Sequence, residues 1–224
     1  MSQFIQQLEE SFSLLKNEDN ALSMAKYMRN QFVFLGIQKT ERHPVFLELY
    51  QQFGKQADWF EVCTSLFDRR EREYHYIAME FLMKRQKEWD ERIPVLVEKW
   101  ILENSWWDVI DVLAPKIMGP YFLMYPNQRD QWLDRWMKSG NFWLQRVCII
   151  FQLLHKSKTD TRLLASVINQ LSSSKEFFIQ KAIGWSLRQY ARTDPDWVFQ
   201  FVESNQLAPL SKREAIRRLM MYEV

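Results

Sequence analysis

The sequence predicts an all-α fold, and three observations support this prediction. Only five glycines and seven prolines occur among 224 residues, while residues with high helix propensity are abundant. Apolar residues recur at three- and four-residue steps along most of the chain, as expected for helices that bury one face. No segment alternates convincingly with a period of two, and no hairpin turn is indicated. Hydrophobic residues make up 47%, which indicates a globular chain with a packed core.

The helical segments can be placed in chain order. The first is LSMAKYMRNQFVFLG, where Gly36 fits the position after a helix C-terminus. Thr40 then fits an N-cap, and Pro44 falls in the first turn of the following helix, where a missing N–H is tolerated. Four later segments show the same periodicity: IPVLVEKWIL, SWWDVIDVLAPKIMG, NFWLQRVCIIFQLL and EFFIQKAIGWSLRQYAR. Short turns are expected between them, for example at SGN and RTDPD.

An internal repeat narrows the fold class. NFWLQRVCIIFQL (141–153) superimposes on EFFIQKAIGWSLR (176–188) at an offset of 35 residues, which aligns an aromatic pair in each. A step of 36 residues back from the first pair reaches Trp106-Trp107, and a step of 35 forward from the second reaches Lys212-Arg213. The more polar last unit suits a terminal cap. Such a repeat of helix pairs is typical of a HEAT-like α–α superhelix, or solenoid, with a concave surface. We therefore expect one HEAT-like repeat domain over residues 1–224.

Net charge and cysteine content exclude few classes of function by themselves. The net charge of +2 is too small to indicate a polyanionic partner. Cys63 and Cys148 stand in apolar surroundings, which favours buried free thiols over a disulfide or zinc site. We expect no bound metal. Because no long apolar run and no secretory signal are found, we expect a cytoplasmic protein without a membrane partner.

One expected helix face combines cations with an aromatic ring. Lys181, Trp185, Arg188 and Arg192 follow one another at steps of four, three and four residues, which places them on one side of a helix. Such a face is either a solvated basic surface with the indole covered by long side chains, or a surface that binds phosphates. The spacing alone leaves both interpretations open.

A second constellation lies in SWWDVID. Trp107 and Asp111 are four residues apart and share a helix face. Taken singly, Trp107 is more simply interpreted as a core residue and Asp111 as a residue that faces solvent. Together, a partly desolvated carboxylate and an indole could stabilise a cationic transition state and orient a water, as glycosidic bond cleavage requires. Arg146, one repeat later, is either a surface arginine or a cation that holds a phosphate beside the reacting sugar.

These residues carry a resemblance to a known family. Five segments, taken in chain order, resemble the AlkD family of bacterial DNA-alkylation repair glycosylases. They are MAKYMRNQFVFLGIQ, SWWDVID, NFWLQR, SSKEFFIQKAIGW and LAPLSKREAI. The resemblance implies a HEAT-like solenoid whose concave, basic face binds duplex DNA. It also implies a nucleoid-associated base excision repair enzyme that releases 7-methylguanine and 3-methyladenine and uses no cofactor. Because the sequence contains no signal for a dimer, we expect a monomer.

The resemblance assigns roles to individual residues. It implies that Asp111 is catalytic, that Trp107 and Trp185 flank the deoxyribose of the lesion, and that Arg146 contacts a phosphate. The remaining DNA-binding positions are Tyr27, Gln38, Phe177, Phe178 and Arg188, to which the basic face adds Lys181. The family's mechanism implies a monofunctional glycosylase that does not flip the base into a pocket.

Two other functions are compatible with the fold alone. A solenoid of this kind could grip damaged DNA without chemistry, or could serve as a protein-binding scaffold. The first alternative makes Asp111 incidental. The second predicts no salt-dependent binding to DNA.

Overall fold

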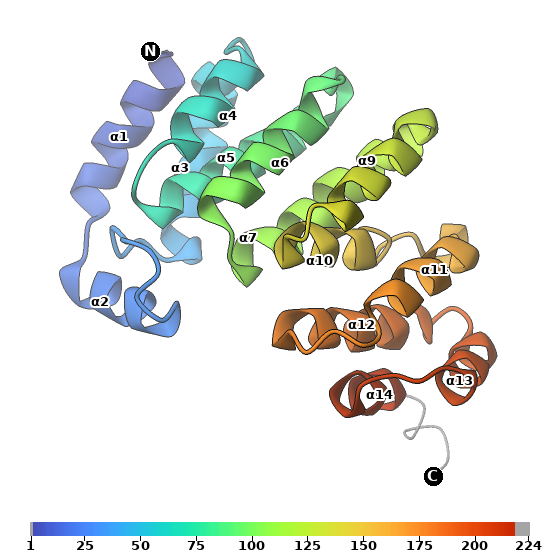
Figure 1. The fold of residues 1–224 in the computed structure, drawn as a ribbon. Helices are drawn as coiled ribbons and strands as arrows, with labels where there is room; N and C mark the ends of the chain where they lie inside the picture. The colour runs from blue at the N-terminus through green and yellow to red at the C-terminus, as the bar shows by residue number, and fades with distance from the viewer. Residues whose placement is uncertain (1, 218–224) are drawn as a thin grey trace. The chain divides into compact units, whose positions relative to one another are not determined.

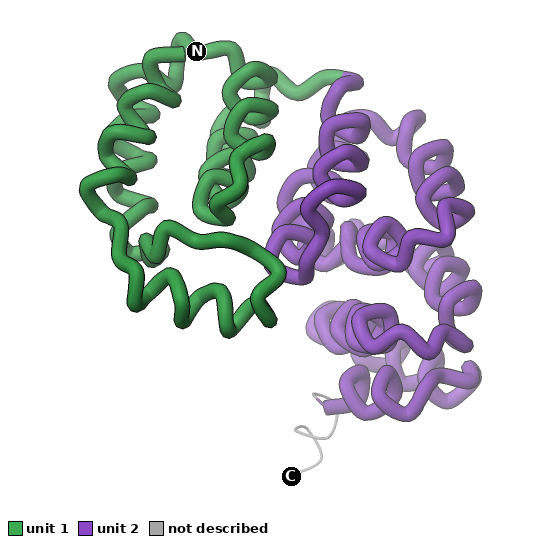
Figure 2. The backbone as a smooth tube through the Cα atoms, turned by 60° about the vertical axis from the view of Figure 1, so that its left-hand side comes forward, with its two compact units in different colours: residues 1–90 green, residues 91–224 purple. Residues whose placement is uncertain are grey.

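The computed structural model describes residues 2–217, and most of them are helical. Within this range no β-strand occurs, and the single extended pairing is an isolated bridge between Val33 and Glu71. The predicted all-α class is therefore confirmed. The chain divides into two compact units, residues 1–90 and residues 91–224 (Figure 2), which are described separately. The predictions of a single domain and of a concave face stay predictions.

The first unit is an arrangement of short helices around an aromatic core. Its helices are α1 (Gln3–Leu15), α2 (Glu18–Tyr27), α3 (Lys39–Leu49), α4 (Trp59–Phe67) and α5 (Arg72–Lys84), with a π-helical turn at Tyr50–Gly54 and a 3-10 turn at Gln86–Glu88 (Figure 1). Helix α1 packs against α3 and α4, and α4 packs against α5. The ring of Phe4 lies 6.3 Å from that of Phe46 and 5.0 Å from that of Phe81.

The segment after α2 differs from the sequence prediction. The periodic pattern predicts a helix that reaches Leu35, but α2 ends at Tyr27, and Asn30 adopts a left-handed conformation with φ of 57°. The reason is a long-range interaction. The buried carboxylate of Glu73 accepts the backbone N–H groups of residues 35–37 at 3.0, 2.9 and 3.1 Å. These bonds hold the segment in an irregular path, in which Phe34, Leu35 and Ile37 are buried without being helical.

Gly36 has a positive φ of 86°, but it does not follow a helix C-terminus as predicted. Instead, its backbone crosses the start of α2 closely. A Cβ atom at this position would lie 1.9 Å from the carbonyl oxygen of Asn17. The glycine is therefore required by both its conformation and this close approach.

The start of α3 also corrects the sequence prediction. The helix begins at Lys39 with Gln38 as its N-cap, so Thr40 lies inside the first turn and is not the cap. The side chain of Glu41 accepts the backbone N–H of Gln38 at 2.9 Å, which satisfies a donor at the helix end. Pro44 consequently lies in the helix interior and not in its first turn.

The second unit contains the remaining helices. They are α6 (Arg92–Asn104), α7 (Trp107–Val112), α8 (Gly119–Met124), α9 (Pro126–Lys138), α10 (Phe142–Ile150), α11 (Thr161–Leu171), α12 (Phe177–Tyr190), α13 (Pro195–Ser204) and α14 (Pro209–Ile216). A π-helical turn, Leu113–Met118, joins α7 to α8, and a 3-10 turn, Lys156–Lys158, precedes α11. Each of the four segments predicted here contains a helix, but their bounds differ from the prediction: α10 ends at Ile150 and α12 at Tyr190, and a π-helical turn follows α7 from Leu113. The sequence also predicts a helix over KREAIRRLMMYEV (212–224), of which the part after residue 217 lies outside the described residues.

The predicted repeat is visible in how these helices stack. Helices α7, α10 and α12 begin at Trp107, Phe142 and Phe177, a constant step of 35 residues. Helix α10 packs against α7 and α12, and α12 packs against α14 (Figure 1). The step of 36 found by aligning aromatic pairs arises because Trp106 is the N-cap of α7 and not its first residue. Asp111, Arg146 and Lys181 therefore occupy equivalent positions, the fifth of each helix.

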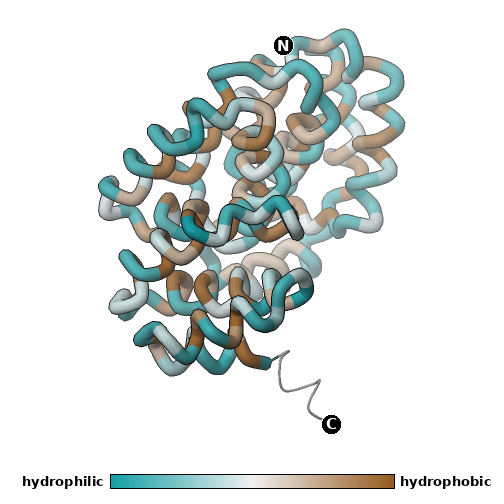
Figure 3. The backbone as a smooth tube through the Cα atoms, turned by 90° about the vertical axis from the view of Figure 1, so that its right-hand side faces the viewer, coloured by the Kyte–Doolittle hydropathy of each residue, from teal (hydrophilic) through white to brown (hydrophobic). Residues whose placement is uncertain are grey.

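Hydrophobic residues recur along the helices of each unit, which suits burial of one side (Figure 3). Cys63 and Cys148 are buried free thiols, as predicted, and burial raises the pKa of both well above the ordinary value. Among residues 2–217 no helix is both long and apolar enough to span a bilayer. In the same range no three His, Cys, Asp or Glu side chains are grouped so that they could hold a metal ion.

Candidate functional site

An ion pair between two predicted site residues joins helices of the second unit. Arg146 donates from Nε and Nη2 to a single oxygen, Oδ1 of Asp111, at 3.0 and 2.7 Å. Its third nitrogen, Nη1, donates to the backbone carbonyl of Phe178 on α12. Arg146 thus links α7, α10 and α12 and keeps only 5% of its side chain exposed, whereas the Asp111 side chain keeps 24%.

The carboxylate of Asp111 is strongly influenced by its surroundings. Burial raises its pKa above the ordinary value, and Asp108 raises it further, while the charge and hydrogen bonds of Arg146 oppose this shift. Oδ2, the oxygen that Arg146 does not contact, accepts no hydrogen bond from any other described residue. One oxygen is therefore fixed by a cation, and the other can still accept a proton or a water hydrogen.

Two tryptophans stand beside this pair. The guanidinium carbon of Arg146 lies 6.0 Å from the ring centroid of Trp185, within the range of a cation–π contact. Trp107 is the first residue of α7 and shares a helix face with Asp111. Both indoles are half-buried, so neither lies in the packed interior of the unit. Arg146 therefore interacts with both Asp111 and Trp185, and Trp107 lies one turn before Asp111 on α7.

An aromatic cluster surrounds the amino-terminal ends of α7, α10 and α12. The Phe178 ring centroid lies 4.7 Å from that of Trp143 and 5.6 Å from that of Trp106. Phe142 and Phe177 extend the cluster, and Phe177 keeps 56% of its surface exposed. The sequence prediction included Phe177 and Phe178 but missed the other three. Their aromatic alignment across the repeat was the available signal, since equivalent helix starts stack side by side.

The predicted basic face of α12 is partly neutralised. Lys181 donates to Oε1 of Glu214 at 2.9 Å, and Arg188 donates to the other carboxylate oxygen. The hydrogen bond from Lys181 is the main cause that lowers the pKa of Glu214. Gly184 permits this contact, since a Cβ there would lie 2.4 Å from the Cβ of Glu214. Glu214 is a charged partner that sequence reasoning did not find.

Arg192 does not belong to the helical face on which it was placed. Helix α12 ends at Tyr190, and Arg192 lies in the turn that follows. Of the cations expected on that face, Lys181 and Arg188 both lie on the helix and share one acidic partner.

Two further predicted residues lie in the first unit. Tyr27 ends α2 with 71% of its surface exposed, and Gln38 is the exposed N-cap of α3. Both are accessible to a ligand. The other predicted site residues all belong to the second unit: Asp111, Trp107, Trp185, Arg146, Phe177, Phe178, Lys181 and Arg188.

Comparison with known proteins decides the family. A sequence profile described as DNA alkylation repair enzyme matches residues 8–219 of the chain. The chain belongs to this family. A solved structure titled as a predicted DNA alkylation repair enzyme from Enterococcus faecalis is similar, with 32% sequence identity and a TM-score of 0.84. The similarity covers 91% of this chain and 96% of that one. Comparison with curated proteins gave no match. This DNA alkylation repair protein therefore acts in repair of alkylated DNA, with DNA as its partner.

Proposed function

We propose that this DNA alkylation repair enzyme is a monofunctional DNA glycosylase of the AlkD type. It hydrolyses the N-glycosidic bond of cationic alkylated purines, chiefly 7-methylguanine and 3-methyladenine, in duplex DNA. The product is an abasic site in an uncut strand, which enters base excision repair. The observation that carries the proposal is the half-buried Asp111 carboxylate, which Arg146 holds on one oxygen. The guanidinium of Arg146 also lies 6.0 Å from the ring centroid of Trp185, and Trp107 precedes Asp111 by one turn of α7.

The chemistry needs few protein groups, because the departing purine is already positively charged. Its release as a neutral base requires no general acid. What remains is positive charge on the deoxyribose, which a carboxylate stabilises directly and an indole stabilises through its ring quadrupole. Oδ2 of Asp111 is the oxygen that orients the attacking water, since Oδ1 already accepts two hydrogen bonds from Arg146. Oδ1 thus anchors the carboxylate to Arg146, and Oδ2 orients the water.

Arg146 has two tasks in this proposal. It holds Asp111 and favours the ionised form of the carboxylate. Only 5% of its side chain is exposed and its nitrogens already donate to Asp111 and Phe178, so it attracts the phosphate next to the lesion through its charge and not through an exposed hydrogen-bonding surface. Exposed Phe177 and Tyr27 supply rings for contacts with the DNA. In line with the resemblance to the AlkD family, the lesion is processed without being flipped into a base pocket. A duplex with a single 7-methylguanine, followed by alkali cleavage, tests for the abasic product.

Uncharged lesions are expected to be released poorly. Hypoxanthine or uracil departs as an anion unless a general acid protonates it, and the proposed site stabilises positive charge on the sugar only. We expect base release from 7-methylguanine duplex to exceed that from a hypoxanthine duplex of the same sequence by at least about 100-fold. Single-turnover rates at saturating protein measure this. Comparable rates for both lesions would mean that another chemistry operates.

Removal of a basic residue from α12 should weaken binding to every DNA sequence alike. We expect Arg188→Ala to reduce the slope of log affinity against log salt concentration by about 1, as for the loss of one phosphate contact. Fluorescence anisotropy with undamaged duplexes of different sequence measures this. Lys212→Ala is the control, because Lys212 is a cation of α14 that pairs with Glu203 and is not among the residues predicted to bind DNA. A loss confined to one DNA sequence would contradict the assignment of a phosphate contact.

A further inference from the structure

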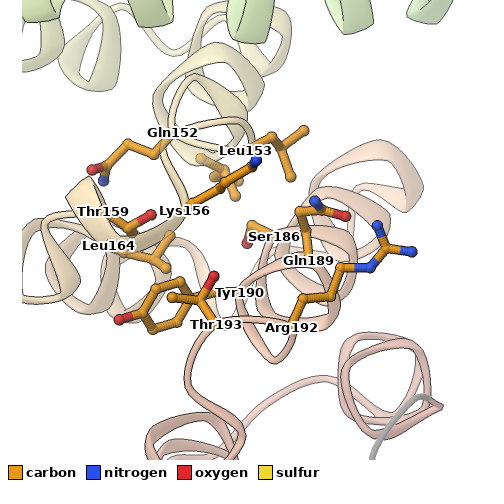
Figure 4. A pocket seen from close by; sticks show the side chains of 11 residues that line it. Gln152, Leu153, Lys156, Thr159, Leu164, Ser186, Gln189, Tyr190, Arg192 and Thr193 are labelled. Carbon is orange, nitrogen blue, oxygen red and sulfur yellow. The ribbon is translucent and has the colours of Figure 1, made fainter.

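The second unit contains a cavity that the proposed active site does not use. Its volume is about 200 Å³, and it lies between the carboxyl-terminal ends of α10 and α12, near the start of α11 (Figure 4). Asp111, Arg146 and Trp185 do not line it. Apolar side chains, including Leu153 and Leu164, and the ring of Tyr190 form part of its wall.

Two cations lie at this cavity. Lys156 and Arg192 both line it, and neither forms an ion pair with another described residue. The nearby carboxylate of Asp160 is already engaged. One of its oxygens accepts the backbone N–H of Leu163 at the start of α11, and the other pairs with Arg129 at 3.4 Å.

A second carboxylate, Asp194, lies near Tyr190. Burial raises the pKa of Tyr190, and the charge of Asp194 raises it further. Asp194 caps α13 by accepting the backbone N–H of Trp197 at 2.9 Å. Neither carboxylate pairs with Lys156 or Arg192, so both cations are available to a ligand.

The backbone at Lys156 supports a role for its side chain. Lys156 has a φ of 54°, a left-handed conformation that follows the end of α10 and that glycine adopts more readily than lysine. A lysine is thus kept where the backbone conformation favours glycine. Strained positions of this kind concentrate at ligand sites, and here the residue is also one of the two unpaired cations.

Neutral polar groups complete the lining. Thr159, Thr193 and Gln189 supply hydroxyl and amide groups that can donate hydrogen bonds. A combination of two cations with such donors suits a phosphate. The volume is below the range of about 300–1,000 Å³ that is usual for drug-sized ligands, so the ligand must be small. The apolar wall and the Tyr190 ring can pack against a few carbon atoms.

We propose that this cavity binds a phosphate group together with the sugar that carries it. Two sources share this chemistry. One is a backbone phosphate with its deoxyribose, at a point on the duplex away from the lesion, and this source rests on the proposed function. The other is a free sugar phosphate. In either case Lys156 and Arg192 contact the phosphate oxygens, and the wall around Tyr190 contacts the sugar.

The first arm of the test uses the free ligand. The full chain is titrated with 2-deoxyribose 5-phosphate and followed by NMR at the backbone amides of Thr159, Gln189 and Thr193. We expect saturable shifts at these amides and an affinity at least about tenfold lower in the double variant Lys156→Gln, Arg192→Gln. Lys158→Gln, an exposed lysine of the same 3-10 turn that does not line the cavity, should bind as the unaltered protein does.

A second variant separates binding from folding. Lys156→Gly removes the cation and places a glycine where φ is positive, so the melting temperature should stay the same or rise while affinity for the sugar phosphate falls. The second arm measures the salt dependence of binding to undamaged duplex. A slope that decreases by about 1 to 2 in the double variant identifies the DNA backbone as the source. An unchanged slope together with saturable binding of 2-deoxyribose 5-phosphate identifies the free ester.

The proposal is overturned if the unaltered protein shows no saturable shifts and the double variant binds duplex with an unchanged salt slope. It is also overturned if Lys158→Gln loses as much affinity as the double variant, because the effect would then be one of general charge. Release of 7-methylguanine is measured with the same preparations. Absent base release alongside saturable binding of the ester would contradict the glycosylase proposal and leave the cavity proposal standing.

Discussion

Replacement of Asp111 by asparagine is expected to lower the rate of 7-methylguanine release by at least about 100-fold, the effect typical of losing one preorganised charge at a reacting centre. The shape of the side chain is kept, so the contacts with α10 survive in part. What is lost is the negative charge beside the sugar. Single-turnover release from a duplex that contains one 7-methylguanine, read out by alkali cleavage, measures the change.

Binding should change in the opposite direction. Asp111→Asn leaves the buried guanidinium of Arg146 without its counter-charge, and this cation then attracts phosphate more strongly. We expect the affinity for damaged duplex to stay the same or to rise. A variant that binds normally and fails to release base separates the proposed glycosylase from a protein that only grips damaged DNA.

The matched control is Asp108→Asn, which makes the same change of charge on the same helix, three residues earlier. Asp108 influences the pKa of Asp111 but is not assigned a contact with the sugar. Its variant should keep base release within about threefold of the unaltered protein, since exposed or half-exposed charges contribute little. Unchanged release in Asp111→Asn, or an equal loss in both variants, would refute the catalytic assignment of Asp111.

The repeat explains why much of the second unit could be predicted from the sequence. Helices α10 and α12 have similar apolar and aromatic patterns at a step of 35 residues, and the pattern reflects local packing of one helix pair on the next. Predictions failed where a distant residue determined the local backbone. Residues 28–38 have the apolar content of a helix, yet the Glu73 carboxylate binds three of their amides. A charged group so far along the chain gives no local signal.

The site residues likewise divide into those that the sequence could identify and those that depend on distant packing. Asp111 and Arg146 could be selected from the sequence because each belongs to a distinctive segment, but their contact with each other was not predicted. It follows from their equivalent positions in successive repeats, since equivalent residues on stacked helices lie side by side. Glu214 could not be selected at all. It is one of 28 acidic residues, and only the close packing of α14 on α12 distinguishes it.

Removal of the Arg146 charge is expected to move the acid side of the pH–rate profile to higher pH. Burial raises the pKa of Asp111, and Arg146 opposes this shift. Base release requires the ionised carboxylate, so activity is lost as the pH falls through the pKa of Asp111. In Arg146→Gln the opposing cation is gone and the pKa rises further. We therefore expect the acid side of the profile to shift to higher pH.

This shift can be measured even if Arg146→Gln also weakens DNA binding. Single-turnover rates at saturating protein report the enzyme–DNA complex, so the position of the acid side does not depend on affinity or on the maximal rate. Lys181→Gln is the matched control, because Lys181 holds the equivalent position in the next repeat and pairs with Glu214, not with Asp111. Its profile should keep the original position. If both variants shift equally, the titrating group senses the general charge of α10 and α12, and Arg146 does not act on Asp111 specifically. If neither shifts, the carboxylate whose ionisation limits base release is not Asp111.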